Sequence, residues 1–139
     1  MTIKDQLLLS LMGQVTASRD AALADDITLC WLKIVRKFSP LIGANSVRLI
    51  FERSLENNLA TFDWLPALVS PSQPDTAVER LRTSMTARPS IDILAAHRAI
   101  LNTFIDLMTT LIGARLTIQF LQAAFPADVA GSNTEENPG

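Results

Sequence analysis

The chain has 139 residues, of which 48% are hydrophobic and 19% charged, and its formal net charge is −2. This size and balance exclude an intrinsically disordered chain and predict one globular domain with its own core. The slight acidity argues against a nucleic-acid-binding protein, which normally carries a basic surface. A single cysteine, Cys30, excludes an internal disulfide framework and favours a cytoplasmic location. No apolar run is long enough to predict a membrane span.

Apolar residues recur with helical spacing along the chain, and prolines and glycines separate the helical segments. The expected helices cover about residues 3–17, 25–39, from just after Gly43 to near Phe62, 76–87, 90–112 and 114–125. The expected N-cap residues are Asn45 or Ser46, Asp75 or Thr76, and Ser90. Residues 1–125 are therefore expected to form a single helical-bundle domain. Residues 126–139 are polar and contain Gly and Pro, which predicts a disordered C-terminal tail.

The tetrapeptide Leu-Ile-Gly-Ala occurs twice, at residues 41–44 and 111–114. At this offset, apolar positions before and after the turn coincide. The matched pairs are Trp31 with Leu101, Ile34 with Phe104, Val35 with Ile105, Phe38 with Met108, Ile50 with Phe120, Phe51 with Leu121, and Leu55 with Phe125. Each copy predicts a core-facing helix, a turn with a left-handed glycine, and a second helix. Whether by duplication or by chance, two such hairpins packed face to face predict an all-α fold with a four-helix core.

His97 is the only histidine and lies near the centre of the apolar arc of the helix that starts at Ser90. We expect a buried histidine that makes one hydrogen bond. A second role is left open, in which His97 faces the bundle interior and helps to bind haem or a small apolar ligand. A closed zinc site is not expected, because His97 has no companion ligands.

The segment AAHRAILN, residues 95–102, resembles the phosphoacceptor helix of histidine phosphotransfer domains, which are also helical bundles. The resemblance is limited to Ala96 and His97, and it implies that His97 accepts a phosphoryl group. That family typically has Lys three and Gly four residues after the histidine, where this chain has Ile100 and Leu101. The departure puts phosphotransfer in doubt, since Leu101 would crowd the imidazole.

Two further polar residues, Ser54 and Asn58, fall within the apolar arc of the helix after Gly43. A buried amide needs a hydrogen-bond partner. Local bonding near the helix end would supply one. If the two hairpins pack face to face, Asn58 and Ser54 are also candidates to meet His97 across the core.

No phosphate-binding loop, nucleophile elbow or Cys-x-x-Cys motif is present, so we expect no catalytic residues and no cofactor. The segment LIGANSVRLIFERSLENNLATFDWL, residues 41–65, resembles uncharacterised helical proteins of bacteria that accompany signalling modules. We therefore expect a non-catalytic interaction or regulatory module. A homodimer is expected because two helices have wide apolar faces, which one small bundle would leave partly exposed. These faces comprise Leu7, Leu8, Leu11, Met12 and Val15 in the first helix and the arc from Cys30 to Leu32 in the second.

Overall fold

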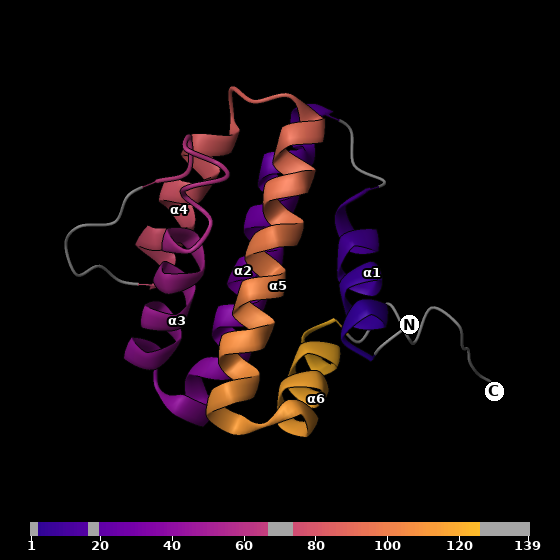
Figure 1. Ribbon diagram of the computed structural model, residues 1–139, viewed down its shortest axis with the longest axis vertical. Helices are drawn as coiled ribbons and strands as arrows, with labels where there is room; N and C mark the ends of the chain where they lie inside the picture. The colour runs from indigo at the N-terminus through magenta and orange to yellow at the C-terminus, as the bar shows by residue number, and fades with distance from the viewer. Residues whose placement is uncertain (1–2, 17–19, 67–73, 126–139) are drawn as a thin grey trace.

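The computed structural model describes residues 3–16, 20–66 and 74–125, and the chain is all-helical there (Figure 1). The helices are α1 (Ile3–Thr16), α2 (Asp20–Ile42), α3 (Ala44–Glu56), α4 (Pro74–Met85), α5 (Ser90–Ile112) and α6 (Ala114–Ala124). The predicted all-α bundle of six helices is thus confirmed. No helix in these ranges is both long and apolar enough to cross a membrane. The predicted tail, residues 126–139, lies outside the described residues.

The two halves of the chain fold in the same way. α2 and α5 each have 23 residues, and each ends directly before a glycine that begins the next helix. In Figure 1 these two helices form the centre, with α3 and α4 on one side and α1 and α6 on the other. α2 packs on α6 as α5 packs on α3, and α4 covers α2 as α1 covers α5. The arrangement is therefore approximately repeated, with α1–α3 corresponding to α4–α6, and the packing of α3 on α4 is the main departure from the repeat.

The buried positions follow the same repeat. In α1 they are Leu7, Leu8 and Leu11, and in α4 they are Ala77, Val78 and Leu81, which are the equivalent positions at the offset of the two Gly turns. The offset between the two Leu-Ile-Gly-Ala segments matches apolar positions in the two hairpins only. The structure extends the repeat to α1 and α4. The other residues of the two helices share no pattern that would reveal the repeat, because Leu9 is matched with Glu79 and Met12 with Arg82.

The two glycine turns have nearly identical geometry. Gly43 has φ 93° and ψ 144°, and Gly113 has φ 91° and ψ 157°. Each glycine N–H donates to a carbonyl of the preceding helix, that of Ser39 or Thr109, at 2.8 Å. The positive φ expected for these glycines is confirmed, but ψ is extended rather than left-handed helical. This combination is essentially restricted to glycine.

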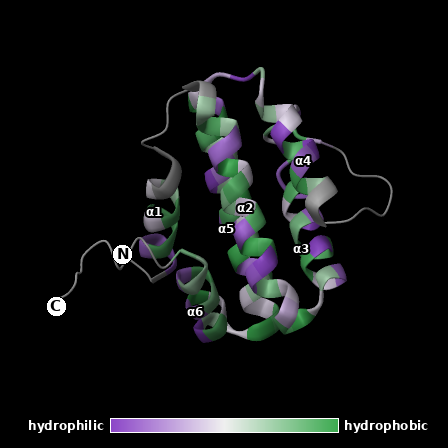
Figure 2. Cartoon of the chain, turned by 180° about the vertical axis from the view of Figure 1, so that it is seen from behind, coloured by the Kyte–Doolittle hydropathy of each residue, from purple (hydrophilic) through white to green (hydrophobic). Residues whose placement is uncertain are grey.

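Aromatic side chains fill the centre of the bundle. The Trp31 ring of α2 is fully buried, with ring centroids 4.9 Å from Phe51 of α3 and 5.3 Å from Phe104 of α5. Phe38 meets Phe104 edge-on at 5.9 Å. Such pairs add about 0.5–1.5 kcal/mol each beyond the burial of apolar area. The core thus ties α3 to both central helices, and Figure 2 shows hydrophobic residues along their facing sides.

The apolar faces that suggested a homodimer are largely covered within one chain. Leu7, Leu8 and Leu11 of α1 and Cys30 and Trp31 of α2 are all buried. The side chain of Val15 lies outside the described set. Other large apolar side chains remain exposed, namely Leu9, Leu29, Leu41, Leu49, Ile91, Leu111 and Leu116.

Two of the predicted N-caps are wrong. Gly43 occupies the N-cap position of α3 and Pro89 that of α5, and neither helix start has a side-chain capping bond. The Asn45 side chain instead accepts hydrogen bonds from Arg48. Because α2 ends at Ile42 and Gly43 alone separates it from α3, Asn45 is the second residue of α3 and cannot be its N-cap. The side chains of Asp75 and Thr76 lie outside the described set.

Helix α3 ends at Glu56, about six residues earlier than predicted. In a continued helix the Asn58 N–H would donate to the carbonyl of Ser54. The Asn58 side-chain amide takes that carbonyl instead, at 2.7 Å, and the backbone N–H turns to Leu55 at 3.1 Å. Such competition by a side-chain amide is a general reason why asparagine ends helices.

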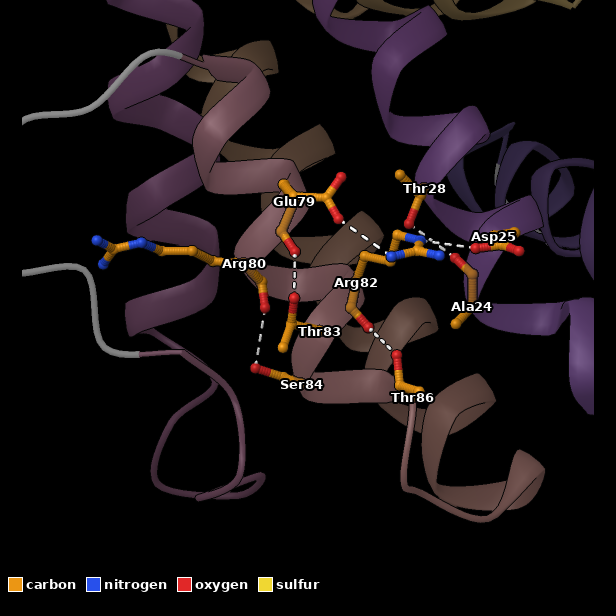
Figure 3. A network of polar contacts seen from close by, with 9 residues as sticks. All are labelled: Ala24, Asp25, Thr28, Glu79, Arg80, Arg82, Thr83, Ser84 and Thr86. Carbon is orange, nitrogen blue, oxygen red and sulfur yellow. Dashed lines mark hydrogen bonds and ion pairs between the residues drawn. The ribbon is translucent and has the colours of Figure 1, made fainter.

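A polar network joins α4 to α2 on the outside of the bundle (Figure 3). Arg82 donates from Nε to Asp25 at 2.6 Å and from Nη1 to Glu79 at 3.2 Å. All three side chains are substantially exposed, so these ion pairs orient α4 more than they stabilise it.

Candidate functional site

His97 lies in the interior between α5 and α2, as predicted. Its side chain is 1% exposed, and its Nδ1 accepts a hydrogen bond from Nε1 of Trp31 at 3.3 Å. The indole nitrogen is only a donor, so Nδ1 has no proton and the neutral ring carries its proton on Nε2. The predicted single hydrogen bond therefore exists, but its partner is Trp31 rather than Asn58 or Ser54.

The other nitrogen of His97, Nε2, is the one buried side-chain polar atom without a hydrogen-bond partner among the described residues. Burial lowers the pKa of His97 to about 3. A charged imidazolium would also turn a second donor toward Trp31. His97 is thus neutral across the physiological range, at the cost of one unpaired N–H.

Ser54 and Asn58 form a separate polar contact. The Ser54 hydroxyl is buried and donates to the carbonyl of Ile50 at 2.8 Å. Asn58 is half-buried and donates to the Ser54 carbonyl and, at 3.1 Å, to the Thr103 hydroxyl of α5. The local bonding predicted for Asn58 is present, and the bond to Thr103 joins the end of α3 to α5.

These buried groups offer little reactive chemistry. Haem iron or a phosphoryl donor must approach a ring nitrogen directly, whereas Nδ1 of His97 is bonded to Trp31 and Nε2 is enclosed. Burial raises the pKa of the Cys30 thiol to about 12, so it is protonated at neutral pH and a poor nucleophile. Within the described ranges no group of three His, Cys, Asp or Glu side chains is placed to hold a metal ion.

An apolar groove lies at the surface between α3 and α5, and sequence reasoning missed it. Its volume is about 320 Å³, and its lining residues are Leu49, Ile50, Arg53, Leu107, Thr110 and Leu111. We call it the α3–α5 groove. Leu49 and Leu111 are each 56% exposed. Leu49 lies outside the buried arc of α3, which is a signal in the sequence that points to this surface. Leu111 falls within the apolar arc of α5, so the sequence predicted it to be buried, and its exposure at the end of that helix is seen only in the structure.

The equivalent surface of the other half, between α6 and α2, has different chemistry. Gln119 stands in place of Leu49, Lys37 in place of Leu107, and Ala123 in place of Arg53. Phe120 packs against Phe38 there, with ring centroids 5.5 Å apart, and the Lys37 ammonium lies 5.9 Å from the Phe120 ring. Leu41, the counterpart of Leu111, is also an exposed leucine, whereas the counterparts of Leu49, Leu107 and Arg53 differ. The fold alone therefore does not require the exposed Leu49 of the α3–α5 groove.

Comparison of the chain with protein-family models, with curated proteins and with solved structures finds no match.

Proposed function

We propose that this protein is a non-catalytic interaction module that binds a partner protein through the α3–α5 groove. The observation that carries the proposal is an apolar groove bordered by the exposed Leu49 and Leu111, where the other half of the fold has Gln119 in place of Leu49. Exposure of grouped apolar side chains to water is unfavourable, and such a group on a protein surface commonly marks a binding site. The expected setting, from the resemblance of residues 41–65, is regulation in bacterial signalling, in the cytoplasm.

The form of the groove favours an amphipathic helix as its occupant. Side chains of α3 and of α5 line the two sides of an open, mainly apolar groove. Helices bind such channels through apolar residues that recur every three or four positions. Leu49 and Leu111 would lie on either side of the bound helix.

Arg53 indicates the charge of that helix. It is exposed at the groove, and it forms no ion pair within the part of the chain that the structure describes. A carboxylate next to the apolar residues of the partner would pair with it. A second copy docked through the same groove would bring two Arg53 side chains into one interface, and no acidic residue lines the groove. The charge therefore favours a different protein over a second copy.

Leucine-to-glutamate variants test the proposal. Wild type, Leu111→Glu and Leu49→Glu are expressed at native level in the host, and the size of the complex containing the chain is measured by size-exclusion chromatography. We expect wild type in a complex larger than the purified chain forms alone, and both variants at the size of the purified chain alone. Leu41→Glu is the matched control, because Leu41 occupies the same position in the other half and is also exposed, at 39%.

Purified variants must keep the thermal stability of wild type, so that loss of the complex reports loss of binding. A complex that survives both groove variants, or that Leu41→Glu disrupts equally, would exclude the groove as the binding surface.

A further inference from the structure

We infer that the face of α2 opposite the α3–α5 groove is a second binding surface, which receives an acidic segment of a protein. Lys33, Arg36 and Lys37 lie within little more than one turn of α2, and we call them the α2 basic patch. None of the three forms an ion pair with any residue that the structure describes. The inference does not depend on the proposed function, because the two surfaces share no residue.

Two cations of the patch lie over aromatic rings, one in α6 and one at the residue that follows it. The Lys33 ammonium lies 5.7 Å from the centroid of Phe125, and the Lys37 ammonium lies 5.9 Å from that of Phe120. Contact with a ring face limits the motion of each ammonium without neutralising its charge. An incoming carboxylate therefore meets cations that have already lost part of their side-chain entropy.

Among the described residues Arg36 has no such ring contact. The equivalent position in the other half of the chain has a different role. The equivalent residue in α5 is Asp106, which pairs with Lys4 of α1 at 2.6 Å and so links two helices. The position equivalent to Lys4 in the second half is Pro74, which carries no charge. The position that forms an internal ion pair in one half thus presents, in the other, a guanidinium that has no ion-pair partner among the described residues.

The extent of the patch favours an acidic protein segment over other polyanions. Nucleic acids are bound by wide basic surfaces, whereas this chain has a net charge of −2 and the patch comprises three cations. Membrane-surface helices insert an apolar face into lipid, whereas the apolar face of α2 is buried in the bundle. Two or three carboxylates at helical spacing match the patch in size and charge. Figure 2 views the chain from the side of α2 and shows hydrophilic turns in its middle.

Titration of the full chain with a blocked hexaglutamate peptide tests the inference. Binding is followed by amide and side-chain NMR shifts at physiological salt. We expect shifts at the three cations and at the rings of Phe120 and Phe125. Replacing Lys33, Arg36 and Lys37 together by Gln should weaken binding about tenfold, and Arg36→Gln alone about twofold, as for exposed ion pairs. The matched control replaces three exposed arginines elsewhere, Arg80, Arg98 and Arg115, by Gln and should leave affinity unchanged.

A purely structural role of the lysines predicts another result. Lys33→Gln and Lys37→Gln would then lower the melting temperature, and Arg36→Gln would change neither stability nor peptide binding. That outcome would overturn the inference, as would equal shifts at the control arginines. A short DNA duplex or vesicles containing phosphatidylserine serve as parallel probes. Tighter binding of either one than of the peptide, through the same three residues, would overturn the assignment to a protein segment.

Discussion

At the scale of single residues, the Trp31–His97 pair defines the interior. The apolar arc of the 90–112 segment correctly predicted that His97 is buried. It did not predict the partner, because Trp31 lies 66 positions away and counts in any pattern only as a large apolar side chain. Asn58 instead donates to Thr103 of α5, 45 positions along the chain. Pairing across a core depends on helix rotation and offset, which periodicity does not determine.

The lowered pKa of His97 predicts a specific loss of stability in acid. The unfolded chain binds a proton with an ordinary pKa near 6.5, whereas the folded chain does so only near pH 3. This contribution is therefore fully present above pH 6.5 and is lost as pH falls toward 3. The loss approaches about 1.4 kcal/mol per pH unit. Urea unfolding at pH 7.5, 6.0 and 5.0 measures it.

His97→Gln provides the comparison, since its side-chain oxygen can still accept from Trp31 but does not titrate. Over the window from pH 6.5 to 5, wild type should lose about 2 kcal/mol more than the variant. Parallel pH profiles for the two proteins would show that His97 is protonated in the folded state and is accessible to solvent.

At the scale of helices and turns, the pattern of apolar residues located every helix, and the errors lie at helix ends. α2 continues through Pro40 to Ile42, although the proline suggested an end at Ser39. A proline in the last turn of a helix interrupts little, because few hydrogen bonds remain to be made after it. The early end of α3 comes from the side chain of Asn58, a local competition that hydrophobic spacing does not record.

The two glycine turns should respond equally to substitution. At Gly43 and Gly113 an added Cβ would meet no atom within 4 Å, so the cost of alanine comes only from the backbone conformation. We expect Gly43→Ala and Gly113→Ala each to lower the free energy of unfolding by about 1–3 kcal/mol. The sites lie on separate hairpins, so the double variant should show the sum of the two losses. Thermal or urea unfolding measures all three proteins.

Gly13 is the matched control for this prediction. It lies inside α1 with equally open space around its Cβ position. Alanine there should instead stabilise the protein by about 0.5–1 kcal/mol, because it favours the helix. A neutral effect of alanine at Gly43 and Gly113 would mean that the turns do not hold a positive φ in solution.

At the scale of the whole molecule, the repeated fold separates structure from function. Positions that both halves bury maintain the bundle, whereas the proposed binding sites include surface positions that differ between the halves, such as Leu49 in the groove and Arg36 in the α2 basic patch. The Leu-Ile-Gly-Ala repeat pointed to the hairpins but could not identify the α3–α5 groove. Whether a given leucine is exposed depends on how the neighbouring helices pack, which the sequence pattern does not determine. Leu41 and Leu111 match in sequence, yet only Leu111 borders the groove.

The homodimer expected from the sequence stays a prediction, which now rests on exposed leucines outside the groove, such as Leu9 and Leu29. Light scattering at tens of micromolar should give about twice the chain mass of 15.2 kDa. Leu111→Glu should keep that mass, because the groove is assigned to another protein. A monomeric wild type would contradict the dimer, and a dimer lost in Leu111→Glu would assign the groove to a second copy.

The central claim, that the α3–α5 groove binds a different protein, is tested most directly by photo-crosslinking in the host. The photoreactive residue p-benzoylphenylalanine is placed at Leu111 or, as the matched position, at Leu41, and crosslinked peptides are identified by mass spectrometry. We predict one dominant product from Leu111, with a helix of another protein that carries a carboxylate near its apolar face, and we predict that this product is absent from Leu41. The same product from both positions, or no product from Leu111, would contradict the account.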